Sequence, residues 1–433
     1  MRGQLWEQFQ LPSGLLGLVR RAEEKVQVLW EEIRRRRAFN QGKVLRAFLS
    51  VGVEEHHLVG TTGYGYGDAG RQALGEVFAR ALGAERALVS PQIASGTHAI
   101  AACLFGVLRP GDHLLFATGQ PYDTLRGVIG CWGETPGSLR ELGVSYSQVP
   151  LLPDGRVDVA GVLAALEPRT RVVAFQRSRG YALRPSLTLE QLRPAIEAVK
   201  GARPDVVVFV DNCYGEFVEE QEPTELGADL MAGSLIKNPG GGLAPGGGYV
   251  AGRSDLVERV AARLTAPGLG DRVGPTYDFL RPLFQGFFLA PHFVGEALLS
   301  AVFIAALAEE MGLEADPAWD APRGDIVQAI ILRDPRALQA FCCGLQSGAA
   351  VGSRLRPEPS PMPGYSDPVL MVGGGFVQGA SLEFSADAPL RPPYAVFLQG
   401  GLVLEQAQLA VLFGFKRLQE EGFLDEGFLR RIS

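Results

Sequence analysis

The sequence predicts an α/β protein, with a large domain on a mainly parallel seven-stranded sheet and a smaller C-terminal α/β domain. Short apolar runs alternate with helically periodic segments from about residue 60 to 255, a rhythm typical of parallel strands joined by crossover helices. After that point longer helices dominate. We expect an N-terminal helical arm over 1–55, the large domain over 56–290 and the smaller domain over 291–433.

Apolar spacing predicts the elements in chain order. The first 50 residues have an amphipathic helical pattern. In the large domain we expect the strands RALVS, HLLFAT, RVVAF, VVVFV, DLMAGSL and GGYVAG, and the helices GTHAIAACLFGVL, one beginning near PYDTL, and LEQLRPAIEAVK. In the smaller domain we expect a helix over 290–313, a strand AIILRD, a helix ALQAFCCGL, a loop over 354–368 and a final helix LVLEQAQLAVLFGFKRLQEEG.

Composition excludes several classes of protein. A net charge of -7 and a pI near 5.5 argue against a general nucleic-acid binder, which needs a basic surface. The five cysteines include the adjacent pair Cys342 and Cys343 and lack metal-ligand spacing, so they predict reduced thiols in a cytoplasmic protein without a metal site. The longest apolar stretch, 297–308, falls short of the ~20 residues that a membrane span needs. We expect no nucleic-acid or membrane partner.

Lys237 is the first candidate for chemistry. It stands among small and apolar residues in SLIKNPGGGLAPGGG, in a chain that otherwise prefers arginine. A lysine can lose its proton and become an amine nucleophile, whereas an arginine cannot. The alternative is a lysine that opens a glycine-rich surface loop.

Asp211 follows the apolar run VVVFV, at the carboxyl end of an expected central strand. A carboxylate at a buried position needs a cationic or hydrogen-bonding partner. The protonated ring nitrogen of a bound cofactor would be such a partner. A cap on the following turn is the structural alternative.

Other strand ends add weaker signals. Ser95, Gly96 and Thr97 open a helix whose free N–H groups suit a phosphate, although any helix favours such a cap. Tyr122 follows another strand, where an aromatic ring can stack on a planar ligand or cover the core. Ser234 lies three residues before Lys237. Together, a lysine, a carboxylate, a phosphate site and an aromatic ring meet the needs of pyridoxal 5'-phosphate.

The motifs narrow this prediction. The segments GTTGYGYGDAGR, SGTHAI, PYDTL, QRSRGY, DNCYGEFVE, SLIKNPGGGLAPGGGYVAG and FSADAPLRPPY run in order from about residue 40 to the C-terminus. They resemble the methionine gamma-lyase-like family, often labelled aluminium resistance protein or carbon-sulfur lyase. This family is a branch of the Cys/Met metabolism pyridoxal enzymes of fold type I.

The resemblance implies roles for particular residues. Lys237 would hold pyridoxal 5'-phosphate as an internal aldimine, Asp211 would keep the pyridine nitrogen protonated, and Tyr122 would stack on the ring and assist the leaving sulfur. The phosphate would be bound by Ser95, Gly96, Thr97 and Ser234, with Tyr64 or Tyr66 reaching it from a neighbouring subunit of a homodimer or homotetramer. The candidates for the substrate carboxylate are Arg391, Arg177 and Arg179.

The resemblance implies a lyase that removes a sulfur leaving group from an amino acid of the cystathionine, cysteine or methionine type. Lys237, once displaced by the substrate, would act as the general base at Cα. The spacing of the residues does not distinguish alpha,beta- from alpha,gamma-elimination. An aminotransferase, racemase or decarboxylase would need the same groups, and a phosphate-binding interaction protein is the non-enzymatic alternative.

Overall fold

A computed structural model gives the fold and describes residues 6, 8–9, 11–133 and 135–424. The chain divides into two compact units. The larger comprises Arg37–His292 with Arg323–Asp325, and the smaller comprises Met1–Arg36, Phe293–Pro322 and Ile326–Ser433. The helices α2 (Ser13–Val51) and α9 (Leu280–Glu310) contribute to both. The boundaries drawn from the sequence, near residues 55 and 290, stay a prediction.

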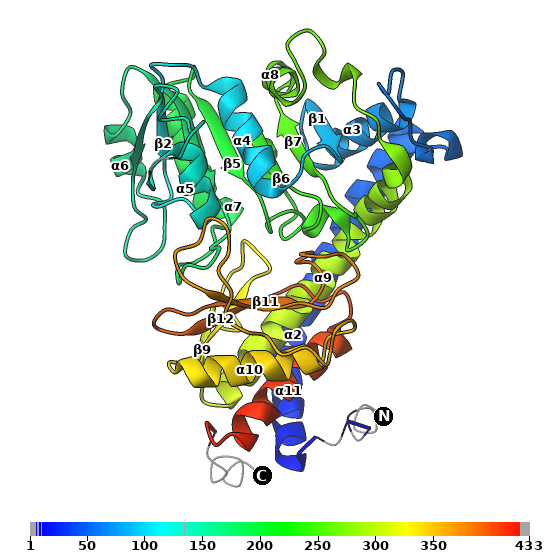
Figure 1. Cartoon of the computed structure of the whole chain (residues 1–433), viewed down its shortest axis with the longest axis vertical. Helices are drawn as coiled ribbons and strands as arrows, with labels where there is room; N and C mark the ends of the chain where they lie inside the picture. The colour runs from blue at the N-terminus through cyan, green and yellow to red at the C-terminus, as the bar shows by residue number, and fades with distance from the viewer. Residues whose placement is uncertain (1–5, 7, 10, 134, 425–433) are drawn as a thin grey trace. The chain divides into compact units, whose positions relative to one another are not determined.

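The larger unit is built on a seven-stranded sheet with the order β1-β7-β6-β5-β4-β2-β3 (Figure 1). Strands β2 to β6 run parallel, and β7 runs antiparallel to both of its neighbours. This confirms the predicted α/β fold with a mainly parallel sheet. The strands are β1 (Arg86–Ser90), β2 (His113–Phe116), β3 (Ser145–Gln148), β4 (Thr170–Gln176), β5 (Val207–Asp211), β6 (Leu230–Ser234) and β7 (Gly248–Gly252).

Helices cover the sheet because the strands are apolar on both faces. Alternate strand residues, such as Val207 and Phe209 of β5, form one core with α4, α5 and α8. Helix α7 contacts β5 and contributes nothing to that cluster. The helices are α3 (Ala69–Ala81), α4 (Gly96–Val107), α5 (Asp123–Ile129), α6 (Val159–Ala164), α7 (Leu189–Ala202) and α8 (Ser254–Leu264), with the short 3-10 turns η1 (Glu55–Leu58), η2 (Pro223–Leu226), η3 (Asn238–Gly240), η4 (Gly270–Arg272) and η5 (Tyr277–Phe279).

The smaller unit contains a five-stranded antiparallel sheet with the order β10-β11-β12-β9-β8. Helix α10 packs on this sheet, and α11 packs against α10 (Figure 1). The elements are β8 (Glu314–Asp316), β9 (Gln328–Ile331), α10 (Pro335–Ser347), β10 (Val369–Val372), β11 (Ser385–Pro389), β12 (Ala395–Gln399) and α11 (Leu404–Glu420). The smaller unit thus contains both helices and strands, as predicted, and its sheet is antiparallel.

Several elements were not predicted or begin elsewhere, and two of these differences have clear physical reasons. Strand β3 has the sequence SYSQ, which lacks an apolar run because it lies at the sheet edge and is only half-buried. Helix α9 begins at Leu280 and not near residue 290, since Pro282 falls in its first turn, where no intrahelical N–H bond is lost. The helical stretch Tyr277–Glu310 is apolar and long enough to cross a membrane, but 72% of its most apolar window is buried in the protein. That burial makes it weak evidence for a span.

Candidate active site

The parallel strands bring their carboxyl ends together at one edge of the sheet. Gln176, the last residue of β4, pairs in register with Asp211, the last residue of β5. Asp211 in turn pairs with Ala232 of β6, which ends two residues later at Ser234. In open α/β sheets ligands bind beyond this edge. The predicted residues of β5 and β6 therefore lie side by side.

Lys237 follows β6 and begins a tight turn. Its N–H donates to the Ser234 carbonyl over 3.4 Å, and η3 starts at the next residue, Asn238. The side chain is half-buried. Because Ser234 is the last residue of β6, the turn keeps the lysine at the strand end.

The lysine loop has no room for side chains at its glycines. A Cβ on Gly240 would lie 1.6 Å from the Leu235 carbonyl oxygen, and a Cβ on Gly286 of α9 would lie 2.1 Å from the Gly240 carbonyl oxygen. Such distances are far below van der Waals contact. Gly240 lets the loop turn tightly on itself, and Gly286 lets the loop rest directly on the helix backbone.

The Lys237 amine lies in a cluster of aromatic and acidic groups. Its Nζ is 3.8 Å from the ring centroid of Tyr214. Burial acts to lower the pKa of Lys237, but the nearby Cys213, Tyr214, Asp211 and Tyr122 together raise it above its ordinary value. These surroundings favour the ammonium form in the free protein.

Asp211 is buried, with 4% of its surface exposed. Burial raises the pKa of its carboxyl group, against the opposing effect of Lys237. Its Oδ1 accepts a hydrogen bond from the Cys213 N–H at 3.1 Å. A carboxylate desolvated in this way is stabilised by a cation placed against it.

The N-terminus of α4 is suited to an anion. Ser95 is the N-cap and accepts from the His98 N–H at 3.1 Å. Within the described part of the chain, the N–H groups of Gly96 and Thr97 find no acceptor. A Cβ on Gly96 would lie 3.2 Å from both Cys213 Sγ and Ser234 Cβ. Free N–H groups beside a serine fit a phosphate, so the residues present fit pyridoxal 5'-phosphate at this end of the site.

Tyr122 stands at the N-cap of α5 and is tied to the same helix terminus. Its hydroxyl lies 2.9 Å from the Thr97 hydroxyl, which also contacts Thr124 at 2.9 Å. The Tyr122 N–H donates to Gln176 Oε1 at 3.0 Å. Burial, followed by Asp211 and Cys213, raises the pKa of Tyr122, so its hydroxyl remains protonated at neutral pH.

Arg177 has a different environment from the other predicted site residues. It is fully buried and donates to Asn212 Oδ1 at 2.9 Å and to the Gly215 carbonyl at 2.8 Å. It also forms an ion pair with Glu219, and Glu222 lies 3.9 Å away. These acceptors belong to the protein, which is typical of an arginine that supports structure.

The other two predicted arginines each lie beside an aspartate. Arg179 is buried beside Asp325, whose Oδ2 accepts from the Arg179 N–H at 3.1 Å. Arg391 belongs to the smaller unit, where it pairs with Asp367 at 3.3 Å. Which arginine receives the substrate carboxylate stays a prediction.

Tyr64 and Tyr66 form an exposed pair on a glycine-rich loop. Their rings stack with centroids 5.3 Å apart, and 73% and 66% of their surfaces are exposed. Arg71 holds the loop by donating to the carbonyls of Gly65 and Gly274. The described chain makes no ring contact or hydrogen bond from either tyrosine to Lys237, so their predicted role depends on a second subunit.

Three functional neighbours were missed by the sequence analysis. Tyr214 contacts the lysine, Gln176 positions Tyr122, and Glu216 is a fully buried carboxyl that accepts from the Tyr249 hydroxyl at 2.8 Å. Burial raises the pKa of Glu216 to about 8. The motif DNCYGEF contains two of these residues, but it does not reveal which side chains point to the lysine.

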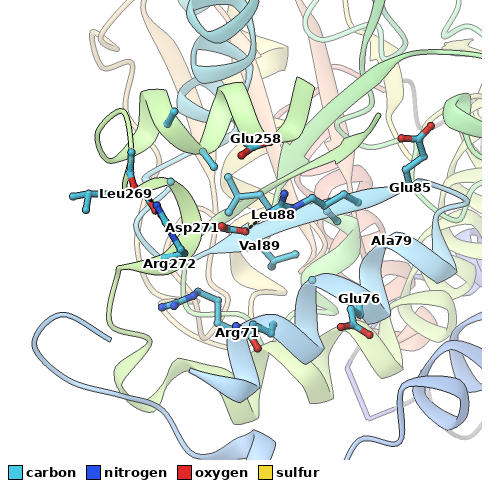
Figure 2. A pocket seen from close by; sticks show the side chains of 18 residues that line it. Arg71, Glu76, Ala79, Glu85, Leu88, Val89, Glu258, Leu269, Asp271 and Arg272 are labelled. Atoms are coloured by element: carbon cyan, nitrogen blue, oxygen red, sulfur yellow. Dashed lines mark hydrogen bonds and ion pairs between the residues drawn. The ribbon is translucent and has the colours of Figure 1, made fainter. Parts of the chain in front are cut away.

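A separate cavity of about 580 Å³ lies along β1 between α3 and α8 (Figure 2). Arg71, Glu76 and Glu258 line it, together with an ion pair between Arg86 and Asp271. None of the residues predicted to bind the cofactor lines it. This cavity is therefore distinct from the candidate active site. The described residues also contain no group of three or more His, Cys, Asp or Glu that could hold a metal.

Comparison with known proteins places this geometry in a family. The family model described as methionine gamma-lyase matches residues 15–419. The chain is similar to YnbB of Bacillus subtilis, with 47% identity over 90% of this chain and 92% of that protein. It is also similar to the solved structure of a carbon-sulfur lyase involved in aluminium resistance from Clostridium novyi. That comparison has a TM-score of 0.92 and 42% identity, over 96% of this chain and 98% of the other.

A more distant similarity joins it to the L-methionine gamma-lyase of Pseudomonas deceptionensis, at 29% identity over 41% of this chain and 37% of that enzyme. The fold and the family predicted from the motifs are thereby confirmed. The chain belongs to the methionine gamma-lyase family, a family of pyridoxal-phosphate-dependent carbon-sulfur lyases of fold type I.

Proposed function

We propose that the protein binds pyridoxal 5'-phosphate covalently through Lys237 and cleaves a carbon–sulfur bond of a sulfur-containing amino acid by alpha,beta- or alpha,gamma-elimination. The observation that carries this proposal is the cluster in which Asp211, Tyr122 and Tyr214 surround the lysine amine. A nucleophilic amine, a buried carboxylate and a protonated phenol have complementary roles in amino-acid chemistry.

The residues would divide the work of holding the cofactor. Gly96 and Thr97 N–H groups, with Ser95 and Ser234, would bind its phosphate, and the Tyr122 ring would stack on its pyridine. Asp211 would accept a hydrogen bond from the ring nitrogen and keep it protonated. When bound, the cofactor supplies an electron sink for the charge that develops at the substrate Cα.

Lys237 and Tyr122 would then move the protons. Displaced by the substrate amino group, the Lys237 amine takes the proton from Cα and becomes an ammonium ion. The Tyr122 hydroxyl, which stays protonated at neutral pH because burial raises its pKa, can donate to the departing sulfur. The products of beta-elimination are a thiol, ammonia and a 2-oxo acid, and gamma-elimination adds a proton shift from Cβ.

A second copy of the chain would complete the site. Tyr64 and Tyr66 are exposed and stacked on each other, which suits a contact to the phosphate of a neighbouring subunit. We therefore propose that a homodimer is the smallest active form and that two such dimers can associate as a homotetramer. Arg391 is our choice for the substrate carboxylate because a guanidinium can bind it in a bidentate manner. Five free cysteines support a cytoplasmic location.

The test begins with the covalent link. Purified protein is incubated with pyridoxal 5'-phosphate, reduced with borohydride and digested, and the modified peptide is identified by mass spectrometry. We expect one modified lysine, Lys237, and a visible absorbance band that Lys237→Ala abolishes. Lys200→Ala is the matched control, since Lys200 pairs with Asp229 at 2.9 Å away from the site. A protein that gains no band and no adduct contradicts the proposal.

A substrate panel then defines the reaction. Cystathionine, cysteine and methionine are supplied separately, and thiol, ammonia and 2-oxo acid are measured. Pyruvate from cystathionine or cysteine indicates beta-elimination, whereas 2-oxobutyrate from cystathionine, or 2-oxobutyrate with methanethiol from methionine, requires gamma-elimination. A 2-oxo acid formed without thiol and only in the presence of an amino-group acceptor would instead identify an aminotransferase.

A further inference from the structure

Tyr214 is the nearest aromatic group to the reactive lysine, and the roles proposed above leave its ring without a function. The Lys237 Nζ lies 3.8 Å from the ring centroid, well inside the ~6 Å over which a cation and an aromatic face attract each other. The tyrosine comes from the loop after β5, three residues beyond Asp211. The ring and the carboxylate therefore reach the lysine from the same loop.

The backbone of Tyr214 is strained. Its φ is 70°, and Phe217 in the same loop has a φ of 60°. Bulky residues rarely adopt this left-handed conformation, and such strain persists only where the surrounding structure imposes it. An ordinary turn would place glycine or asparagine at these positions. The loop therefore tolerates a strained backbone conformation in order to place a tyrosine at position 214.

Buried hydrogen bonds impose this conformation from several directions. Arg177 donates to Asn212 and to the Gly215 carbonyl, at 2.9 and 2.8 Å. The Phe217 N–H donates to Glu222 Oε1 at 2.8 Å, and Asn238 Nδ2 donates to the Glu216 carbonyl at 2.9 Å. Asn238 directly follows the lysine in sequence. The tyrosine loop and the lysine loop are therefore linked to each other, which fixes the ring relative to the amine.

We propose that Tyr214 is a positioning residue whose ring face holds the Lys237 amine and stabilises its ammonium form. This rests on the proposed function for its purpose: the amine must accept a proton from the substrate Cα inside a partly desolvated site. The titratable groups that face the amine are Asp211 at the end of β5, Cys213, Tyr214 and Glu216 in the loop that follows, and Tyr122 at the N-cap of α5. Tyr214 differs from the others because its ring face attracts the ammonium ion even while its hydroxyl is protonated.

The test measures the lysine amine itself, without cofactor. Trace acetylation of the cofactor-free protein is followed at Lys237 by peptide mass spectrometry from pH 8 to 12, because the pKa of this amine lies above its ordinary value, with Lys200 as the internal reference amine. Removing the ring destabilises the ammonium, so Tyr214→Leu should shift the reactivity midpoint to lower pH by about one unit. Tyr214→Phe keeps the ring and should stay close to wild type.

Each outcome decides the proposal. An unchanged midpoint in Tyr214→Leu, or an equal shift in Tyr214→Phe that assigns the effect to the hydroxyl, overturns it. Tyr214→Asn suits the left-handed backbone and provides a folded variant without the ring, with thermal unfolding as the check. Because acetylation needs no cofactor, absence of the borohydride-fixed adduct in wild type refutes the proposed function while the midpoint shift still tests the ring.

Discussion

Two cations at the same edge of the sheet, Arg177 and Lys237, have contrasting surroundings. Arg177 is enclosed by carbonyl, amide and carboxylate oxygens at hydrogen-bonding distance. Lys237 faces an aromatic ring, a thiol and a carboxyl group that burial keeps from ionising easily. The first arrangement fixes a charge permanently, and the second allows a proton to be exchanged. Burial alone therefore does not identify a catalytic cation. The groups that contact the cation distinguish the two roles.

The largest expected effect comes from removing the exchangeable cation. Lys237→Ala should reduce carbon–sulfur lyase turnover on the order of 10⁴-fold, since it removes both the covalent link and the base. Lys237→Arg should be equally inactive because arginine cannot release its proton. Steady-state thiol release measures the effect. Substantial turnover by the arginine variant would contradict the distinction between the two cations.

Removal of the fixed cation should affect folding. Arg177→Met removes the buried cation that binds Asn212, the Gly215 carbonyl and Glu219, and should cost about 3 to 5 kcal/mol in the free energy of unfolding. Denaturant unfolding measures this. The control is Arg193→Met, an exposed arginine 3.9 Å from Glu197, with an expected change below about 1 kcal/mol. Equal stability of the two variants would mean that the buried network does not support the loop.

Glu216 tests how burial affects an acidic group near the two cations. Burial raises the pKa of its carboxyl from the ordinary 4.5 to about 8. Between these values the folded protein binds a proton that the unfolded chain has released, so wild-type stability should fall as pH rises through this window.

Glu216→Gln removes that titration and should become more stable than wild type by roughly 2 to 4 kcal/mol above pH 8, relative to pH 4.5. Unfolding at several pH values measures the difference, with the exposed Glu220→Gln as control. Parallel pH profiles for wild type and Glu216→Gln would show that this carboxyl is already ionised when buried.

The smallest effect is expected at a surface cation. Lys200 pairs with Asp229 at 2.9 Å, but Asp229 also accepts from Arg253 at 3.2 Å and from the Val208 N–H at 2.8 Å. Lys200→Met should therefore change stability by about 1 kcal/mol or less and leave lyase activity unchanged. Thermal unfolding and thiol release measure both properties. A large loss of stability or activity would show that a half-buried cation such as Lys200 is as important as the buried ones.

Site residues could be predicted from the sequence where a local pattern of apolar residues determines their position. Asp211 and Ser234 could be placed because an apolar strand ends at each of them, and parallel strands align their ends. The Tyr214 ring could not, because its direction depends on a positive φ in a loop that is held by Glu222 and by Arg177, the latter distant in sequence. The role of Arg177 was obscured for a related reason: an arginine in a motif suggests a ligand, and only the fold reveals acceptors around it.

The contact between Gly240 and Gly286 limits how the enzyme can be altered in the laboratory. A methyl group on Gly286 would collide with the Gly240 carbonyl and push the lysine loop off the helix, and a methyl group on Gly240 would collide with the Leu235 carbonyl inside the loop itself. Libraries intended to change substrate preference should therefore leave these two codons untouched and sample side chains elsewhere around the site.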